Sequence, residues 1–527
     1  MPSLLHSLLR EQAKRYPEKP ALEYRGKETS YRGLDAACKR FAGGCTRAGL
    51  ARGARVGIYL PPCTQAVTAF FGTSYCGACL VPVNPVLKSR QVGHILNDCG
   101  VELLVTSSHR LRSLQETLEQ CEHIRHIVLT DPDPEQPAHP YPALAVESWE
   151  AFCAQPVPPD SGLTASDLAA IFYTSGSTGE PKGVMFSHRN LCMGAQSVAT
   201  YLKNTPQDRI LSVLPFSFDY GFSQLTTAFS AGATVVLLDY LLPIDIIKAL
   251  GKYRITGLAG VPSLWQQVCR LEWPENACRQ LRYITSSGDT LPEMTVRLLA
   301  QKLPSADIYL MYGLTEAFRS TYLPPDEVLR RPTSIGKAIP HAQVLVVRPD
   351  GSPCPPGEAG ELVHRGPLVA QGYWNRPLET ARRFRPLGTG PKNSGTTDEI
   401  AVWSGDLVTQ DQNGYLYFVG RKDEMIKTSG YRVSPAEIEG PVNELDAVKE
   451  AVAFAVPHPE RGQAILLVYT TDQDPEATEN ELEQHLASIL PRYMLPAKYI
   501  QVNALPRNSH GKFDRKDLSV RYQSALT

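Results

Sequence analysis

The sequence lacks an excess of charge of either sign. Among its 527 residues, Lys and Arg number 53 and Asp and Glu number 54, which gives a formal net charge of −1. Because a dedicated nucleic-acid-binding protein usually carries a basic excess or stripe, nucleic acid is not an expected partner. With 43% hydrophobic and 20% charged residues, the chain can bury large cores and is not expected to be disordered. Its length predicts more than one domain.

Disulfide density and an export signal are also missing. The 12 cysteines are scattered from Cys38 to Cys354, unlike those of a disulfide scaffold. Cys76 and Cys79 form a CxxC pair without a second such pair, between a predicted buried helix and a strand, which favours core packing over zinc or redox chemistry. The first twenty residues lack a long apolar core followed by a cleavage site of small residues. These features predict a reducing, cytoplasmic setting.

One long uncharged segment has to be checked as a possible membrane span. Residues 61–87 contain no charged side chain. Glycines, hydroxyl side chains, Pro82 and Pro85 interrupt this segment, so its hydropathy is not sustained. We therefore predict a buried helix that leads into a short strand, and no membrane span.

Strand-like apolar segments alternate with longer helix-compatible stretches over the first 320 residues or so. These segments cover residues 55–60, 101–106, 126–130, 169–174, 209–216, 233–238, 281–287 and 306–313. Near-continuous apolar strands separated by helices predict α/β layers in which both faces of each sheet are covered.

The predicted secondary-structure pattern changes twice further along the chain. After residue 335, short strands and turns follow closely and favour an antiparallel β region, with an exposed loop over residues 386–399. After Arg421 the pattern is mixed again. We predict a large N-terminal domain over residues 1–422, built of layered α/β subdomains and a β-rich subdomain, and a small α+β C-terminal domain over residues 423–527.

A glycine- and hydroxyl-rich segment, YTSGSTGEPKG, follows an apolar strand at Tyr173. Glycines let backbone N–H groups approach phosphate oxygens, hydroxyls donate further hydrogen bonds, and Lys182 supplies positive charge. The spacing is not that of a Walker loop. Its position after a buried strand favours a phosphate-binding loop over a flexible linker. The predicted phosphate-binding residues here are Thr174, Ser175, Gly176, Ser177, Thr178, Gly179 and Lys182.

Five motifs occur in one order along the chain: YTSGSTGEPKGVMFSH (173–188), YGLTEA (312–317), WSGDL (403–407), GRKDEMIKTSGYRVSPAEIE (420–439) and NSHGKFDR (508–515). Together they resemble the AMP-forming adenylating (ANL) superfamily of acyl-CoA synthetases, luciferases and nonribosomal adenylation domains. The resemblance implies that the small C-terminal domain is a lid, which rotates between two half-reactions.

The YGLTEA motif offers three groups suited to a nucleotide. Tyr312 presents a flat ring, Thr315 a hydroxyl, and Glu316 a hard oxygen ligand for Mg²⁺. Taken alone, Thr315 can also be a helix cap. By resemblance, Tyr312 stacks on adenine, Thr315 binds the α-phosphate and Glu316 holds magnesium, so that Thr315 and Glu316 count as catalytic.

Further nucleotide contacts are implied by the resemblance. Asp406 in WSGDL matches the carboxylate that binds ribose hydroxyls, although alone it reads as a turn aspartate. Arg421 matches an arginine that contacts ribose or phosphate, although alone it reads as a solvated charge at a strand end. Gly288 and Asp289 are also expected to contact ATP. Ser404 replaces the usual threonine and keeps its hydroxyl.

Three residues are assigned to the lid. Lys512 in NSHGKFDR matches the catalytic lysine, and a mobile lysine can stabilise the negative charge that develops as the adenylate forms. Asp423 matches the hinge. Gly430 matches the tunnel for the pantetheine thiol, where its missing side chain permits close approach, although alone it reads as a turn glycine.

Phe218 and Asp219 are implied to border the substrate acid. Many acyl-CoA synthetases place a histidine or aromatic residue where Phe218 stands. Asp219 falls where amino-acid-activating members carry an aspartate that pairs with the substrate ammonium. It can equally be the cap of a helix that begins at Tyr220. Both interpretations stay open.

The resemblance implies activation of a small-molecule carboxylic acid by ATP and Mg²⁺, followed by transfer to CoA. Segments around Asp219, Asp406 and Gly430 further resemble acyl-CoA ligases associated with exosortase gene clusters. The alternative is amino-acid adenylation with transfer to the phosphopantetheine of an acyl-carrier protein. A non-catalytic nucleotide-binding regulator is disfavoured by the presence of Lys182 and Lys512.

Overall fold

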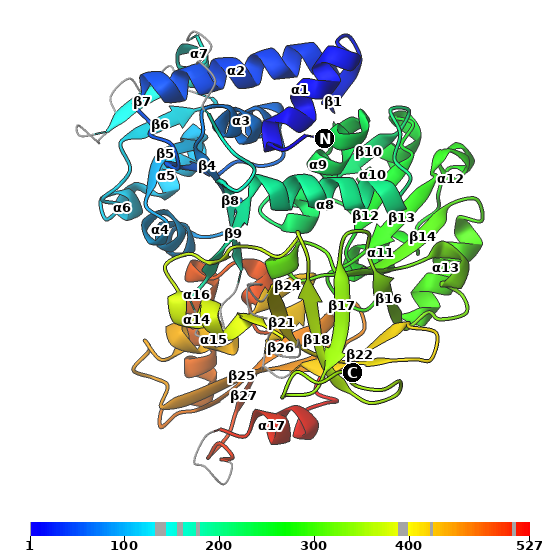
Figure 1. Cartoon of the computed structure of the whole chain (residues 1–527). Coiled ribbons are helices and arrows are strands. Elements are labelled where there is room, and N and C mark those ends of the chain that lie inside the picture. The colour runs from blue at the N-terminus through cyan, green and yellow to red at the C-terminus, as the bar shows by residue number, and fades with distance from the viewer. Residues whose placement is uncertain are drawn as a thin grey trace, which may run out of the picture.

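The computed structural model describes residues 2–131, 144–154, 162–174, 180–387, 399–421, 425–507 and 513–526. Within these residues, three β-sheets organise the molecule, and helices pack between and around them (Figure 1).

One sheet has eight strands in the order β19-β9-β8-β4-β3-β5-β6-β7. Neighbouring strands from β8 to β7 are parallel, whereas β9 runs antiparallel to both β8 and β19. The strands are β3 (Arg55–Ile58), β4 (Cys79–Pro82), β5 (Val101–Thr106), β6 (His126–Leu129), β7 (Ala145–Ser148), β8 (Leu168–Thr174), β9 (Lys182–Ser187) and β19 (Gly372–Tyr373).

The uncharged segment over residues 61–87 forms a buried helix, α3 (Thr64–Tyr75), followed by β4, as predicted. Cys79 is fully buried within the apolar cluster on one side of this sheet. No helix in the described part of the chain combines the length and hydropathy needed to cross a membrane.

The second sheet has 14 strands, and its two halves differ in direction. Strands β1 and β10 to β14 pair in parallel, and from β15 onward the pairs are antiparallel. The strands are β1 (Pro20–Tyr24), β2 (Lys27–Ser30), β10 (Arg209–Ser212), β11 (Thr234–Leu237), β12 (Gly257–Gly260), β13 (Tyr283–Ser286), β14 (Asp307–Tyr312), β15 (Thr321–Leu323), β16 (Ser334–Ala338), β17 (Gln343–Val347), β18 (Gly360–Arg365), β20 (Phe384–Pro386), β21 (Ile400–Gln410) and β22 (Leu416–Arg421). The predicted antiparallel region is therefore present, but it extends the parallel sheet through β15 and β16.

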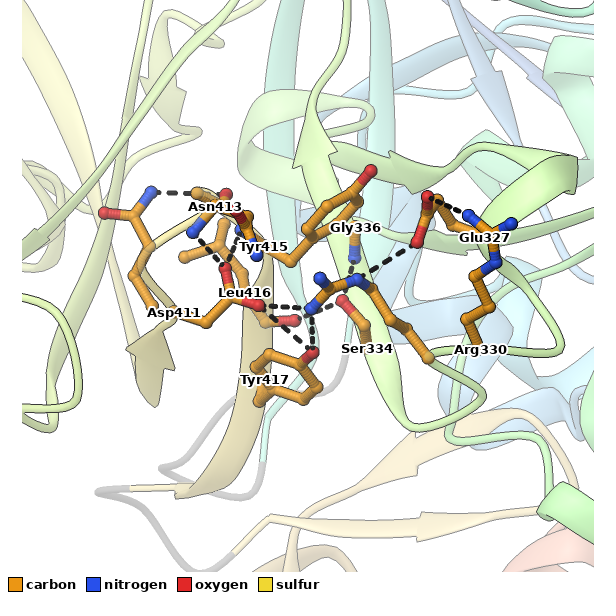
Figure 2. Close-up of polar contacts among 12 residues, drawn as sticks. Glu327, Arg330, Ser334, Gly336, Asp411, Asn413, Tyr415, Leu416 and Tyr417 are labelled. Atoms are coloured by element: carbon orange, nitrogen blue, oxygen red, sulfur yellow. Dashed lines mark hydrogen bonds and ion pairs between the residues drawn. The ribbon is translucent and has the colours of Figure 1, made fainter.

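An arginine holds this junction together (Figure 2). Arg331 Nη1 donates to the carboxylate of Asp411 and, over 3.0 Å, to the hydroxyl of Tyr417, while Nε donates to Glu327 Oε2 over 3.1 Å. These bonds tie the turn before β16 to β22 and to the loop between β21 and β22.

Helices between the two sheets share one apolar core. Phe222 of α9 (Asp219–Ala231) packs edge-on against Phe70 of α3 and Phe172 of β8, with ring centroids 5.5 and 5.4 Å apart. The first residues of α9 are thereby placed near the end of β8. Other helices of this part are α1 (Leu5–Arg15), α2 (Tyr31–Arg47), α4 (Ser89–Asp98), α5 (Ser108–Ser113), α6 (Gln115–Leu118), α7 (Trp149–Phe152), α8 (His188–Tyr201), α10 (Pro243–Lys252), α11 (Pro262–Val268), α12 (Glu275–Gln280), α13 (Glu293–Lys302) and α14 (Pro377–Arg383).

The third sheet and its helices make up the small C-terminal α+β unit that the sequence predicts. It contains β23 (Ile426–Thr428), β24 (Tyr431–Val433), β25 (Glu450–His458), β26 (Gly462–Thr470), β27 (Lys498–Gln501), α15 (Pro435–Val442), α16 (Pro475–Ile489) and α17 (Arg515–Arg521). The boundary between residues 422 and 423 lies outside the described residues and stays a prediction. Most of the loop predicted over residues 386–399 also lies outside them.

Candidate active site

The two ends of the predicted phosphate loop are neighbours. Thr174 ends β8 and is paired directly with Lys182, which begins β9. Lys182 Nζ lies 3.4 Å from Glu379 Oε2 and 3.9 Å from the ring centroid of Tyr373. Burial lowers the pKa of Lys182, and the nearby carboxylates oppose this effect. Residues 175–179, which carry the predicted ligands Ser175, Gly176, Ser177, Thr178 and Gly179, lie outside the described residues.

Glu316 is the buried carboxylate of this region. It lies in the short 3₁₀ helix η1 (Thr315–Ala317), of which Thr315 is the first residue and not the cap, and it is 3% exposed. The hydroxyl of Tyr373 donates to Glu316 Oε1 over 2.5 Å, and Arg383 Nε lies 3.8 Å from the same atom. Burial opposes ionisation, but Arg383 and Arg432 outweigh it and hold the pKa of Glu316 at about 2.

The other oxygen of Glu316 fits a metal ion. Oε2 is buried and has no hydrogen-bond partner among the described residues. An orphaned, ionised carboxylate oxygen is a suitable ligand for Mg²⁺, which in nucleotide sites is held by one or two carboxylates together with phosphate oxygens. A cavity of about 260 Å³ lies beside it. Its ionisable lining is mainly basic and comprises Lys182, Glu316, Glu361, Tyr373, Glu379, Arg382, Arg383, Arg385 and Arg432.

The predicted nucleoside contacts meet where β14 and β21 approach each other. Tyr312 Oη donates to Asp406 Oδ2 over 2.5 Å, and Asp406 is 2% exposed. Arg421 is directly opposite Asp406 in the pairing of β21 with β22. Gly288 and Asp289 line a small cavity of about 50 Å³ together with Tyr312. The structure thus gathers residues that the sequence could join only through a resemblance.

Phe218 and Asp219 open a larger cavity of about 490 Å³. Phe218 is the N-cap of α9, the helix begins at Asp219, and no side chain makes a capping hydrogen bond. The alternative that Asp219 caps a helix beginning at Tyr220 is therefore wrong, because the extended backbone ends at Phe218. Burial raises the pKa of Asp219, and the positive charge of Arg319 opposes this rise.

The C-terminal unit closes the far end of the same cavity. Gly430 lines it with φ of +83°, and a Cβ there would lie 2.9 Å from Val261 Cγ1. This close approach and the positive φ both require glycine. The next residue, Tyr431, packs edge-on against Phe218 at 5.0 Å and stacks on Tyr493 at 3.6 Å, measured between ring centroids.

Two predicted lid residues, Lys512 and Asp423, lie outside the described residues. The helix after the lysine motif, α17, packs on β25, and none of its described residues lines the large cavity. The roles of Lys512 and Asp423 stay predictions.

Sequence reasoning missed several charged or polar side chains of the site. Tyr373, Glu379 and Arg383 reach it only because β19 pairs with β9, and no motif signals this pairing. Arg319 follows Glu316 by three residues and is preceded by the apolar residues Ala317 and Phe318. A charged side chain at this position could have been recognised as a candidate site residue. Arg432 stands inside a motif that the sequence did reveal.

Comparisons with known proteins identify the family of the chain. The family model described as AMP-binding enzyme matches residues 9–374, and that described as AMP-binding enzyme C-terminal domain matches residues 437–512. Gramicidin S synthase 2 of Aneurinibacillus migulanus is 30% identical over 521 residues, which cover 98% of this chain and 11% of the synthase. The chain therefore spans only a small part of the length of that relative.

Two other similar proteins match along most of their length. A long-chain-fatty-acid–CoA ligase of Bacillus subtilis is 26% identical, with 98% of this chain and 94% of the ligase covered. A solved structure of a double mutant of o-succinylbenzoate CoA synthetase (MenE) from Bacillus subtilis, bound with its product analogue OSB-NCoA, is 25% identical with a TM-score of 0.82, and 98% of each chain is covered. The chain belongs to the AMP-binding enzyme family, within the ANL superfamily of adenylate-forming enzymes.

Proposed function

We propose that this enzyme activates a carboxylic acid with ATP to an acyl-adenylate and then transfers the acyl group to the thiol of CoA. The observation that carries the proposal is the continuity of the large cavity. Its lining includes Thr315 and Asp406 at the nucleotide end, Asp219 in the middle, and Gly430 and Tyr431 of the C-terminal unit. One space therefore connects the places where nucleotide, acid and thiol have to meet.

In the first half-reaction, a carboxylate oxygen of the acid attacks the α-phosphorus of ATP. The bond from the α-phosphorus to the bridging oxygen breaks, and pyrophosphate leaves. In this proposal, Lys182 and the arginines of the cavity of about 260 Å³ bind the phosphates. Thr315, which lines the large cavity, binds the α-phosphate. Mg²⁺ held by Glu316 would neutralise phosphate charge. Lys512 is assigned to the charge that develops at the α-phosphate.

In the second half-reaction, the sulfur of the thiol attacks the carbonyl carbon of the adenylate. The carbon–oxygen bond to AMP breaks, AMP leaves, and the thiol proton passes to solvent. In this proposal a thiol arm enters along the loop that holds Gly430, where the backbone lies so close to Val261 that a Cβ would come within 2.9 Å of it. Similarity to the synthetase bound with OSB-NCoA over 98% of both chains supports a CoA thioester as the product.

A second candidate is amino-acid adenylation with transfer to a carrier-protein phosphopantetheine. It is favoured by Asp219, whose buried carboxylate lines the cavity and offers a partner to a substrate ammonium group. Similarity to gramicidin S synthase 2 also supports it. We favour CoA because the similarity to the fatty-acid–CoA ligase extends over 94% of that enzyme.

The test is pyrophosphate release from ATP with panels of fatty, aryl, dicarboxylic and amino acids, followed by thioester formation with CoA or with a phosphopantetheine-loaded carrier protein. We expect acid-dependent pyrophosphate release and a CoA thioester. Absence of acid-dependent release across all panels would refute the proposal. A thioester formed only on the carrier protein would establish the second candidate.

A further inference from the structure

A buried arginine lines the large cavity and has no part in the proposed nucleotide contacts. Arg319 is 2% exposed and follows η1. Its Nη1 donates to Ser287 Oγ over 2.9 Å, and the guanidinium lies 4.6 Å from the ring centroid of Tyr220. Nε is buried and has no hydrogen-bond partner in the described part of the chain. Nη1 of the guanidinium is therefore anchored, whereas Nε has no acceptor among the described residues.

The backbone holds this side chain in place. Phe318, the residue before Arg319, has φ of +60° and ψ of −57°, a region that non-glycine residues rarely adopt. Its ring lies against Gly194, where a Cβ would come within 2.5 Å of the ring. Such strain persists only where the surroundings enforce it, and it is concentrated at functional sites. Arg319 is thus fixed in orientation.

The charge of Arg319 acts on Asp219, but no ion pair between the two side chains is present among the described residues. Both side chains line the same cavity. Burial disfavours the charged form of Asp219, and its pKa is raised although Arg319 opposes the rise. Asp219 therefore does not saturate the hydrogen-bonding capacity of Arg319.

We propose that the guanidinium of Arg319 binds a second carboxylate on the substrate, so that the enzyme prefers a small dicarboxylic acid to a purely aliphatic acid of the same length. A guanidinium presents paired donors that match the two oxygens of a carboxylate. A buried arginine left without an acceptor when substrate expels water is costly, which penalises aliphatic acids. The inference rests on the proposed function and names its substrate class.

The test compares glutarate with pentanoate, two acids of equal chain length, by kcat/KM for pyrophosphate release. We expect wild type to prefer glutarate by at least about tenfold. Arg319→Met should lower the value for glutarate about 100-fold, because glutarate loses its ionic partner, and should raise that for pentanoate, because the unpaired buried cation is removed. Arg319→Lys should restore part of the preference, because it returns the charge without the paired donors. Calorimetric ATP binding verifies that each variant is folded.

Three outcomes would overturn the inference. Wild type could prefer pentanoate, or Arg319→Met could lower both values equally. In the third, Asp219→Asn in the Arg319→Met background restores activity on both acids, which would mean that Arg319 only neutralises Asp219. If any of these results is found while other acids still cause pyrophosphate release, the proposed function stands and only the dicarboxylate preference is refuted. If no acid causes pyrophosphate release, both the preference and the proposed function are refuted.

Discussion

Tyr312 and Asp406, which are 94 residues apart in the sequence, are joined by a hydrogen bond of 2.5 Å from the tyrosine hydroxyl to the aspartate carboxylate. The ring proposed to stack on adenine and the carboxylate proposed to bind ribose are thus held as one unit. In the same sheet, Arg331 donates to Asp411 and Tyr417, both labelled in Figure 2, and so ties the turn before β16 to β22.

Removing the charge of Asp406 should weaken ATP binding. Hydrogen bonds to an ionised carboxylate contribute roughly 1.5–3 kcal/mol, so Asp406→Asn should raise the Kd for ATP by about ten- to a hundredfold. Tyr312→Phe keeps the ring and removes only the bond to Asp406, so its effect should be smaller. Isothermal titration calorimetry measures both. A larger loss in Tyr312→Phe than in Asp406→Asn would contradict the assignment of Asp406 to ribose.

A methyl group at Gly430 should block the thiol step. Gly430→Ala places Cβ 2.9 Å from Val261 Cγ1 and forces a side chain into positive φ. Strain of this kind costs about 1–3 kcal/mol, so thioester formation should fall at least about tenfold while pyrophosphate release changes little. The matched control is Gly440→Ala, where no atom lies within 4 Å of the added Cβ. Equal loss in both half-reactions would remove Gly430 from the thiol passage.

Lys512→Ala should abolish the first half-reaction selectively. A lysine that stabilises the charge of adenylate formation is expected to contribute about two to three orders of magnitude to its rate. The variant should still convert supplied acyl-adenylate and CoA into thioester. Stopped-flow pyrophosphate release and a thioester assay from synthetic adenylate separate the two steps. Release within a few-fold of wild type would refute the assignment.

Glu316→Gln should raise the Mg²⁺ concentration needed for half-maximal activity. Because the pKa of Glu316 is held at about 2, its carboxylate is ionised throughout the working pH range. The defect of the variant should therefore be the same at pH 6 and at pH 8. Mg²⁺ titrations of pyrophosphate release at both pH values measure this. Glu379→Gln, whose side chain faces Lys182, serves as the control and should leave the Mg²⁺ requirement nearly unchanged.

His188 should make the stability of the fold depend on pH. It is fully buried, and its Nδ1 accepts from the backbone N–H of Leu5 over 3.1 Å. Burial lowers the pKa of His188 to about 4, whereas the unfolded chain has the ordinary value near 6.5. The unfolded state binds more protons between these values. The free energy of unfolding should therefore rise with pH from about 4 to 6.5, by about 3 kcal/mol for this residue, and level off above.

The variant His188→Gln keeps an acceptor for the Leu5 N–H and removes the titration, so the rise should become shallower. Urea denaturation between pH 4.5 and 7.5 measures the slope. His109→Gln, at an exposed position, is the control. An unchanged slope in His188→Gln would mean that protonation of another group, such as the buried His364, dominates.

Local patterns predicted much of the fold, because buried parallel strands such as β5 and β8 are recognisable as apolar runs. The joining of the antiparallel strands to the parallel sheet could not be predicted, since it depends on contacts such as Arg331 with Asp411, 80 residues apart. The same holds for the site. Motifs identified Glu316, but Tyr373, which donates to it, belongs to a two-residue strand that has no signal of its own.

The edge-to-face contact of Phe218 with Tyr431 has a thermodynamic consequence. Phe218 lines the large cavity in which we propose that the acid binds, and Tyr431 belongs to the C-terminal unit, so an acid that shifts the Phe218 ring also changes the free energy of the contact between the two parts of the chain. Coupling of this kind is reciprocal: closure must alter the affinity for the acyl group by the same factor. The shape of the bound acid therefore changes the fraction of molecules in which the C-terminal unit keeps its contact with Phe218.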